Sequence, residues 1–172
     1  MDILDIIKNR RSIRKYQKKE VPKEVIKDIL TAAFYAPSAG NARTFEFVVI
    51  DDKEILGKIP KIHPYAAMCA FADKAIVVCG NLDKEKYDGF WSQDCSAATE
   101  NLLLMAHALG VGSVWCGIYP EKDRVESFKK LLNLPKAVIP FAICPLGYPD
   151  ESHQSKERYN EDAVFYNSYS KD

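Results

Sequence analysis

Close to its beginning the chain carries the run Arg10-Arg11-Ser12-Ile13-Arg14-Lys15-Tyr16, directly after a short apolar helical pattern. Three guanidinium groups and a hydroxyl therefore fall within the stretch 10–14. A guanidinium is planar, stays charged at physiological pH and presents several fixed donors, so this cluster suits a phosphate or another fixed anion. A solvated basic loop and a nucleic-acid patch are the ordinary alternatives for a basic run.

The overall composition is that of one ordinary globular domain. The chain has 172 residues, of which 47% are hydrophobic and 28% charged, and at this length roughly 70% of the unfolded surface can be buried. Lys+Arg 24 balance Asp+Glu 24, whereas a nucleic-acid binder needs a surplus of positive charge. We therefore expect a single domain over residues 1–172, no nucleic-acid partner, and a basic run that is a local feature.

The sequence predicts a cytoplasmic protein without a membrane segment or a metal. Residues 1–5 carry acid where a secretory peptide carries base, and the weakly charged stretch 95–115 is interrupted by polar residues, which indicates a buried helix. The five cysteines show no Cys-x-x-Cys spacing and are interpreted as reduced thiols, mostly in the core. The three histidines are scattered and show no metal-ligand pattern.

The first half of the chain alternates predicted helices and strands. Apolar residues at helical spacing predict a short helix over 3–7 and a second helix that Pro22 opens and the Ala36-Pro37 pair ends. Runs of β-branched and aromatic residues predict strands over 45–50 and 75–79.

The second half is richer in strands. A helix from about Trp91 to Leu109, capped by Gly110, has few charges and should be surrounded by protein. A strand is predicted over 113–116, and Asp123 and Glu126 are spaced as a capping box for a helix through 132. The last strand, 138–146, contains two prolines, so we expect it at a sheet edge or with a bulge.

The usual catalytic motifs are missing. Ser113 lacks the Gly-x-Ser-x-Gly frame of a nucleophile elbow, and no Walker motif occurs. Cys116 has no sequence neighbour that would activate it, so we interpret it as structural. Anion-binding segments without an evident acid, base or nucleophile favour a protein whose chemistry belongs to a bound, phosphate-bearing cofactor.

Four segments in this order together closely resemble the nitroreductase family of FMN-dependent oxidoreductases, and this resemblance covers nearly the whole chain. They are the basic run 10–16, Ala36-Pro37-Ser38-Ala39-Gly40-Asn41, Gly110-Val111-Gly112-Ser113-Val114-Trp115-Cys116-Gly117, and Gly147-Tyr148-Pro149 with Lys156-x-Arg158. The resemblance implies an α+β fold with a central, mostly antiparallel sheet flanked by helices. It also implies an intertwined homodimer with FMN at the interface.

The resemblance assigns cofactor contacts residue by residue. Arg10 and Arg11 would lie near the phosphate, Ser12 on the ribityl side, and Arg14 near the pyrimidine edge, where a cation stabilises negative charge on the reduced ring. The remaining matches are a loop reaching FMN from the partner subunit (Pro37, Ser38, Ala39 and Asn41), a strand end passing flavin N5 (Cys116 and Gly117), and a basic pair closing on the phosphate (Lys156 and Arg158).

The implied activity is transfer of hydride from NADH or NADPH to flavin N5, and from there to a small acceptor such as a nitroaromatic, a quinone or an enone. Another flavin chemistry of the family (dehalogenation or dehydrogenation) and a non-catalytic flavin-binding module are the alternatives. The chain departs from the family pattern in two places. Arg43-Thr44-Phe45 follows Asn41 where many members have glutamine, proline and tryptophan, and His63-Pro64-Tyr65 stands where larger members carry an insertion that shapes the pocket.

Overall fold

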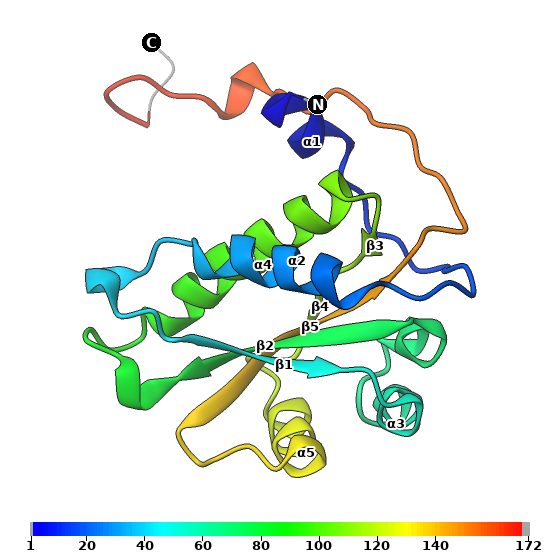
Figure 1. Cartoon of the computed structure of the whole chain (residues 1–172). Helices are drawn as coiled ribbons and strands as arrows, with labels where there is room; N and C mark the ends of the chain where they lie inside the picture. The colour runs from blue at the N-terminus through cyan, green and yellow to red at the C-terminus, as the bar shows by residue number, and fades with distance from the viewer. Residues whose placement is uncertain (1, 170–172) are drawn as a thin grey trace.

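The computed structural model describes residues 2–169, and these residues form a three-layer α+β fold (Figure 1). A central sheet has α2 (Lys23–Phe34) and α4 (Trp91–Ala108) on one face and α3 (Lys53–Ile62) and α5 (Lys122–Leu132) on the other. The short helix α1 (Ile3–Asn9) lies beyond the C-terminal end of α4, away from the sheet. The predicted α+β class, with helices flanking a sheet, is confirmed.

The sheet is antiparallel along all four of its ladders. Its strands are β1 (Phe45–Ile50), β2 (Lys74–Asn81), β3 (Gly112–Ser113), β4 (Cys116–Gly117) and β5 (Val138–Gly147), in the order β1-β2-β5-β3 with β4 also paired to β5. β1 and β2 contain the two strands that the β-branched runs predict. A parallel bridge between Ser12 and Ser113 attaches the basic run to the β3 edge.

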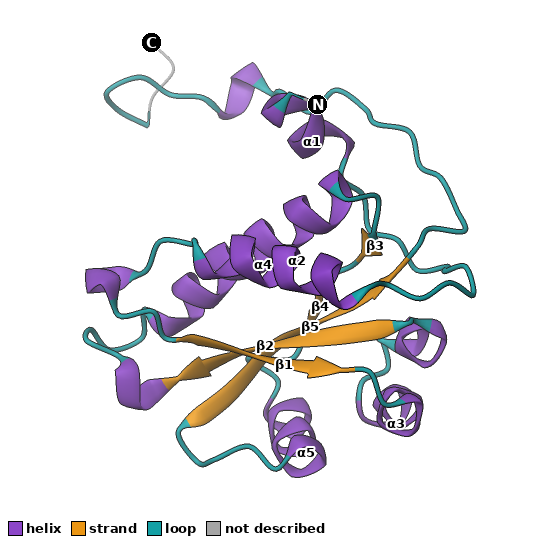
Figure 2. Ribbon diagram, viewed as in Figure 1, coloured by secondary structure: helices purple, strands orange, loops and turns teal. Residues whose placement is uncertain are grey.

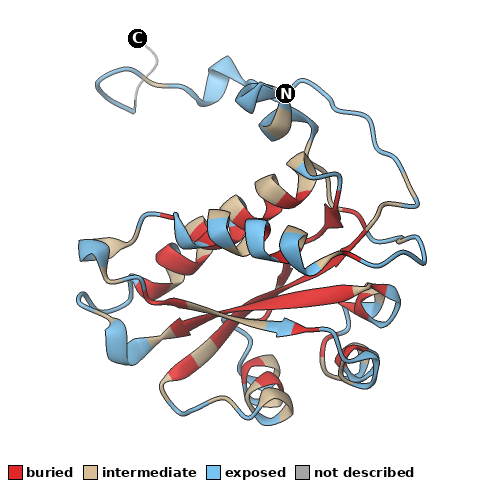
Figure 3. Ribbon diagram, in the orientation of Figure 1, coloured by how far each residue is buried: buried red, intermediate tan, exposed pale blue. Residues whose placement is uncertain are grey.

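Two apolar cores stabilise the layers, one on each face of the sheet. Alternate residues of β2 and β5 point to opposite faces, so Ile76 and Val78 pack toward α2 and α4 whereas Ala75 and Val77 pack toward α3 and α5. Figure 3 shows this burial concentrated in the strands and in the inner side of α4. The expectation that α4 is surrounded by protein is met, because eight of its residues are buried.

The last strand differs from the expectation in one respect. β5 is central rather than at an edge, because β2 pairs along one side and β3 and β4 along the other. The bulge is present: Val78 pairs with Ala142 and Cys79 with Pro140, which leaves Phe141 without a counterpart on β2. The Phe141 carbonyl instead accepts from the N–H groups of Ile118 and Tyr119, at 2.9 and 3.0 Å.

Two further local expectations are wrong. The strand expected over 113–116 is two separate pairs, β3 and β4, because the chain leaves the ladder at Val114 and Trp115 and pairs again with β5 further along. The capping box is absent: α5 begins after Glu121, which makes no side-chain cap, and Asp123 lies inside the first turn. There its charge is favourable for the helix dipole without capping an N–H group.

Beyond β5 the chain is a long irregular segment with one short 3-10 turn, η4 (Glu161–Ala163) (Figure 2). It runs along the outside of the molecule toward α1 and is almost wholly exposed. Within residues 2–169, no helix is both long and apolar enough to cross a membrane.

Candidate functional site

The basic run is held against the sheet edge by close backbone contacts. Besides the Ser12–Ser113 bridge, the Ile13 N–H donates to the Ser113 carbonyl at 2.9 Å. This approach requires glycine at 112, because a Cβ there would lie 2.7 Å from Ile13 Cγ2. The sheet therefore fixes the backbone from which the three arginines project.

The segment after β5, which we call the strap (residues 148–158), is bonded along the basic run. The Gln17 N–H donates to the Tyr148 carbonyl at 2.8 Å, and the Asp150 N–H donates to the Lys15 carbonyl at 2.9 Å. Farther along, the Ser155 hydroxyl donates to the Lys8 carbonyl at 2.7 Å. The strap and the basic run, which are more than 130 residues apart in sequence, thus run side by side.

Glu151 makes the central contact between the two segments. Its Oε1 accepts from the backbone N–H groups of Arg14 at 2.6 Å and Lys15 at 3.2 Å, and its other oxygen lies 3.6 Å from His153 Nε2. These backbone donors and the neighbouring histidine hold the pKa of the Glu151 carboxyl below 4.5. An ionised Glu151 therefore fastens the strap onto the arginine-bearing segment.

Between the basic run and the strap lies a cavity of about 690 Å³, which we call the basic cradle. Its lining includes six of the residues selected from the sequence: Arg10, Arg11, Ser12, Arg14, Lys156 and Arg158. The structure therefore brings together the first and last of the four sequence segments. Arg10 also lies 3.8 Å from Glu100 of α4, which keeps its side chain half-buried beside the cradle.

Arg11 is the most constrained of these side chains. It donates from Nη1 to the Arg10 carbonyl at 2.6 Å and from Nε to the Gln154 carbonyl at 3.4 Å. Its Nη2 is buried and has no partner among the described residues. Leaving a buried charged donor without an acceptor costs more than about 1–3 kcal/mol, so this atom marks a place where an anion is favoured.

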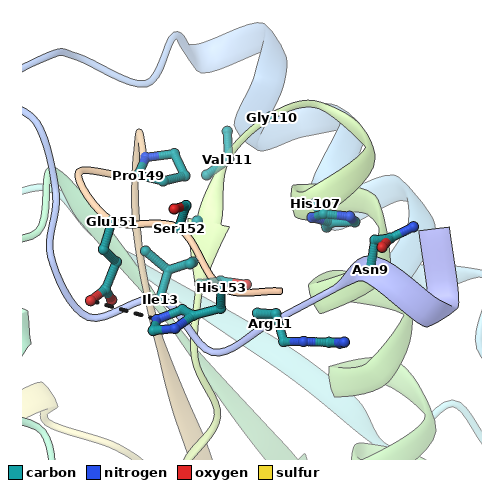
Figure 4. A pocket seen from close by; sticks show the side chains of 12 residues that line it. Asn9, Arg11, Ile13, His107, Gly110, Val111, Pro149, Glu151, Ser152 and His153 are labelled. Carbon is teal, nitrogen blue, oxygen red and sulfur yellow. Dashed lines mark ion pairs between the residues drawn. The ribbon is translucent and has the colours of Figure 1, made fainter. Parts of the chain in front are cut away.

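Arg11 also lines an adjoining pocket of about 270 Å³ (Figure 4), where it lies near His107 of α4 and His153 of the strap. Burial, together with the charges of Arg10 and Arg11, lowers the pKa of His107. His107 is therefore neutral beside the two arginines at neutral pH.

Arg14 also lines a second cavity of about 290 Å³. We call it the ring-edge pocket, because it contains the residues that the family resemblance places beside the flavin ring. Cys116 and Gly117 line this pocket, so eight of the twelve selected residues fall in two cavities that share Arg14. Burial raises the pKa of the Cys116 thiol to about 11. The thiol is therefore protonated at neutral pH, in agreement with its interpretation as structural.

The Gly117 carbonyl is held from two sides. His63 Nε2 lies 2.8 Å away and Arg124 Nη1 donates to it at 3.1 Å. Since the Tyr65 N–H donates to His63 Nδ1 at 3.3 Å, Nε2 is the nitrogen that carries the proton. Burial is the main cause that lowers the pKa of His63, so the ring stays neutral and keeps this arrangement.

The remaining four selected residues, Pro37, Ser38, Ala39 and Asn41, do not line any of these three cavities. The Ala39 N–H donates to Asp94 in the first turn of α4 at 2.8 Å. The cradle lies beside Glu100 of the same helix and the adjoining pocket beside His107, which at 1.5 Å per residue are about 10–20 Å further along the helix axis. Within one chain, the loop and the cradle are separate.

Residues that sequence reasoning did not select also line these cavities. Glu151 and His153 stand in the polar strap, and Arg124 in the first turn of α5, where nothing in the local pattern marks them. The only signal lay in His63-Pro64-Tyr65, which departs from the family pattern and supplies two residues of the ring-edge pocket. No group of three or more His, Cys, Asp or Glu is placed to hold a metal ion in the described part of the chain.

An antiparallel sheet covered on both faces, with an arginine-rich cavity where a strap crosses its edge, defines an α+β protein with a cavity suited to an anionic group. The family model described as "Nitroreductase family" matches residues 7–148. The chain therefore belongs to the nitroreductase family.

Individual relatives are similar over almost their whole length. A protein of Methanothermobacter thermautotrophicus named "Putative NADH dehydrogenase/NAD(P)H nitroreductase" is 51% identical over 164 residues, which are 95% of this chain and 86% of the relative. A solved structure of the same name from Bacteroides thetaiotaomicron has a TM-score of 0.92 at 41% identity, covering 97% of this chain and 98% of that one. The FMN-dependent nitroreductase of Clostridium difficile R20291 has a TM-score of 0.90 at 31% identity, covering 96% and 99%.

Proposed function

We propose that the protein is an FMN-dependent oxidoreductase that passes hydride from NADH or NADPH to a small acceptor such as a nitroaromatic, a quinone or an enone. The observation that carries the proposal is the buried, unpartnered Nη2 of Arg11, a residue that lines two cavities of a chain that belongs to the nitroreductase family. The similarity to an FMN-dependent nitroreductase supports the choice of cofactor.

The residues of the basic cradle fit a flavin mononucleotide. A phosphate dianion takes several charged donors, and Arg10, Arg11, Lys156 and Arg158 supply them around one cavity together with the Ser12 hydroxyl. The Arg11 Nη2 would gain in the phosphate the acceptor that the protein itself does not offer. A solvated basic run would expose its donors to water, whereas here a buried arginine donor lacks an acceptor that a phosphate would supply.

The ring-edge pocket, which shares Arg14 with the basic cradle, would border the ring end of the same cofactor. When bound, FMN supplies the two-electron hydride chemistry for which the chain has no side chain of its own. Arg14, at the junction of the two cavities, would place its charge beside the ring and stabilise the negative charge that reduction brings. The protonated thiol of Cys116 would stay unreactive beside it.

The active form we propose is a homodimer. α1 buries none of its residues within one chain, and Ile3, Leu4 and Ile7 are 73%, 55% and 50% exposed. The loop at 37–41, separate from the cradle of its own chain, would be free to reach the cradle of a second copy. A domain over the whole of residues 1–172, working in the cytoplasm, remains our prediction.

The test is an absorbance spectrum of the purified protein followed by identification of the released chromophore. We expect a yellow protein that releases FMN without covalent cleavage and oxidises NAD(P)H when an artificial acceptor is added. A colourless protein that fails to take up added FMN would contradict the cofactor. A flavin that is bound but never reduced by NAD(P)H would favour the non-catalytic module.

The proposed dimer is tested by light scattering of the flavin-loaded protein. We expect about twice the mass of 19.4 kDa that one chain has. A monomer that holds FMN stoichiometrically would contradict the jointly built site.

A further inference from the structure

The ring-edge pocket contains a second arginine that the cofactor assignment does not use. Arg124 lies in the first turn of α5 and lines the same pocket as Arg14 of the basic run. It donates from Nη1 to the Gly117 carbonyl at 3.1 Å, and its guanidinium lies 5.4 Å from the centre of the Tyr65 ring. These two contacts fix its position at the wall of the pocket.

Arg124 shares its pocket with one carboxylate, Glu121, but does not form an ion pair with it. No carboxylate among residues 2–169 forms an ion pair with it, although seven such pairs occur elsewhere in the described chain. Burial, and to a lesser degree the charge of Arg124, lowers the pKa of the neighbouring His63, so the imidazole adds no second positive charge at neutral pH. A guanidinium with donors left over and no anionic partner is suited to take an anion from solution.

Three exposed aromatic side chains form part of the pocket wall, together with Val114, Pro120 and Glu121. Tyr65, Trp115 and Tyr119 line it, and they are 72%, 36% and 42% exposed. Large rings left in solvent around a cavity of about 290 Å³ offer flat apolar surface for a planar ligand. The combination of a fixed cation with aromatic walls differs from the basic cradle, whose lining is polar and includes no Phe, Tyr or Trp.

We infer that Arg124 is the acceptor-binding cation of this enzyme, and that its preferred acceptors are planar aromatic compounds that carry a carboxylate. The inference rests on the proposed function, because it assigns the acceptor end of the same site. The reducible ring would lie against the aromatic walls beside Gly117, and its carboxylate would pair with the guanidinium of Arg124. Arg124 is not needed to bind the cofactor phosphate, because the phosphate donors line the basic cradle, which shares only Arg14 with the ring-edge pocket.

The test compares 4-nitrobenzoate with the neutral 4-nitrobenzamide as acceptors. The bound flavin is first reduced chemically under anaerobic conditions, so that NAD(P)H, which is itself anionic, plays no part. Reoxidation by each acceptor is then followed by stopped-flow absorbance, and the readout is the ratio of the two second-order rate constants. Ratios cancel the different intrinsic reactivities of the two compounds between variants.

We expect Arg124→Gln to lower the preference for 4-nitrobenzoate about tenfold or more, the effect of losing one charged hydrogen bond. Arg124→Lys should restore part of the preference, because it keeps the charge but not the planar fork. Lys122→Gln is the matched control: it removes the same charge from the same helix turn, but Lys122 is exposed and does not line the pocket. Its ratio should equal that of the wild type.

Two results would overturn the inference. If both acceptors slowed equally in Arg124→Gln, the residue would act through the Gly117 carbonyl and not on the acceptor. If Arg124→Gln lost FMN stoichiometry instead, the arginine would belong to the cofactor site. Failure of the proposed function is a separate observation, because the wild type would then bind no reducible flavin at all.

Discussion

Gly112→Ala is the substitution that tests how the basic cradle is built. A Cβ at residue 112 would lie 2.7 Å from Ile13 Cγ2, 2.9 Å from Ile13 Cβ and 3.2 Å from the Gly147 carbonyl oxygen. Two of these distances are shorter than packed carbon atoms allow, and Ile13 is itself buried. The new methyl group must therefore push the basic run away from β3.

The expected cost has two parts. Overpacking a tight contact destabilises a fold by about 1–3 kcal/mol. Displacing Ser12 and its neighbouring arginines should also lose at least one charged hydrogen bond to the cofactor, or about ten- to a hundredfold in FMN affinity. Urea denaturation of the apoprotein measures the first part, and a fluorescence titration with FMN measures the second.

Gly57→Ala is the control for this experiment. Gly57 lies on the exposed side of α3, and a Cβ there would meet nothing within 4 Å. Alanine should stabilise that helix by up to about 1 kcal/mol, because it restricts the unfolded chain more than glycine does. If Gly112→Ala matched Gly57→Ala in both stability and FMN affinity, the close approach of Ile13 would not hold the cradle in place.

Three further predictions concern single charges of the site. Arg10→Ala and Arg158→Ala should each weaken FMN binding about ten- to a hundredfold while leaving riboflavin affinity nearly unchanged, because riboflavin lacks the phosphate; equal losses for both ligands in a titration would refute this assignment. Arg14→Met should lower the midpoint potential of the bound flavin, and an unchanged potential in a dye-equilibration measurement would remove Arg14 from the ring edge. The folded pKa of Glu151 lies below 4.5, so the hydrogen bonds that its carboxylate accepts from the basic run stabilise the strap above that pH, and this stability is lost as the pH falls through the folded pKa. Proteolysis of the strap should therefore become faster in acid. Glu151→Gln, whose side chain does not titrate, should flatten that pH dependence.

Local patterns were sufficient for most of the elements. The β-branched runs predicted β1 and β2, and α4 ends beside Gly110, whose φ of 72° suits the expected cap. These patterns report on one strand or one helix face, which is what a local sequence contains. The errors arose where strand pairing sets the limits of an element. β3 and β4 are two short strands because each pairs with a different part of β5.

Eight of the twelve residues selected from the sequence line the basic cradle or the ring-edge pocket, but their grouping could not be predicted. Family resemblance pointed to the basic run and to Lys156-x-Arg158, and the fold brings both to one cavity. Glu151 and Arg124 were missed because a carboxylate that binds backbone N–H groups 137 residues away, or an arginine that reaches a glycine carbonyl, has no signature in its neighbours.

By itself the sequence determined the balance of charge, the helical and strand periodicities and the concentration of guanidinium groups near one end of the chain. Only the tertiary structure decided that the strap lies along the basic run, that Arg11 is left with a buried donor, and that a second arginine, Arg124, lines the same pocket as Arg14. The physical reason is the range of the interactions. Periodicity follows from the geometry of neighbouring residues, whereas a binding site depends on contacts between segments whose separation in space is set only when the sheet and its two apolar cores have formed.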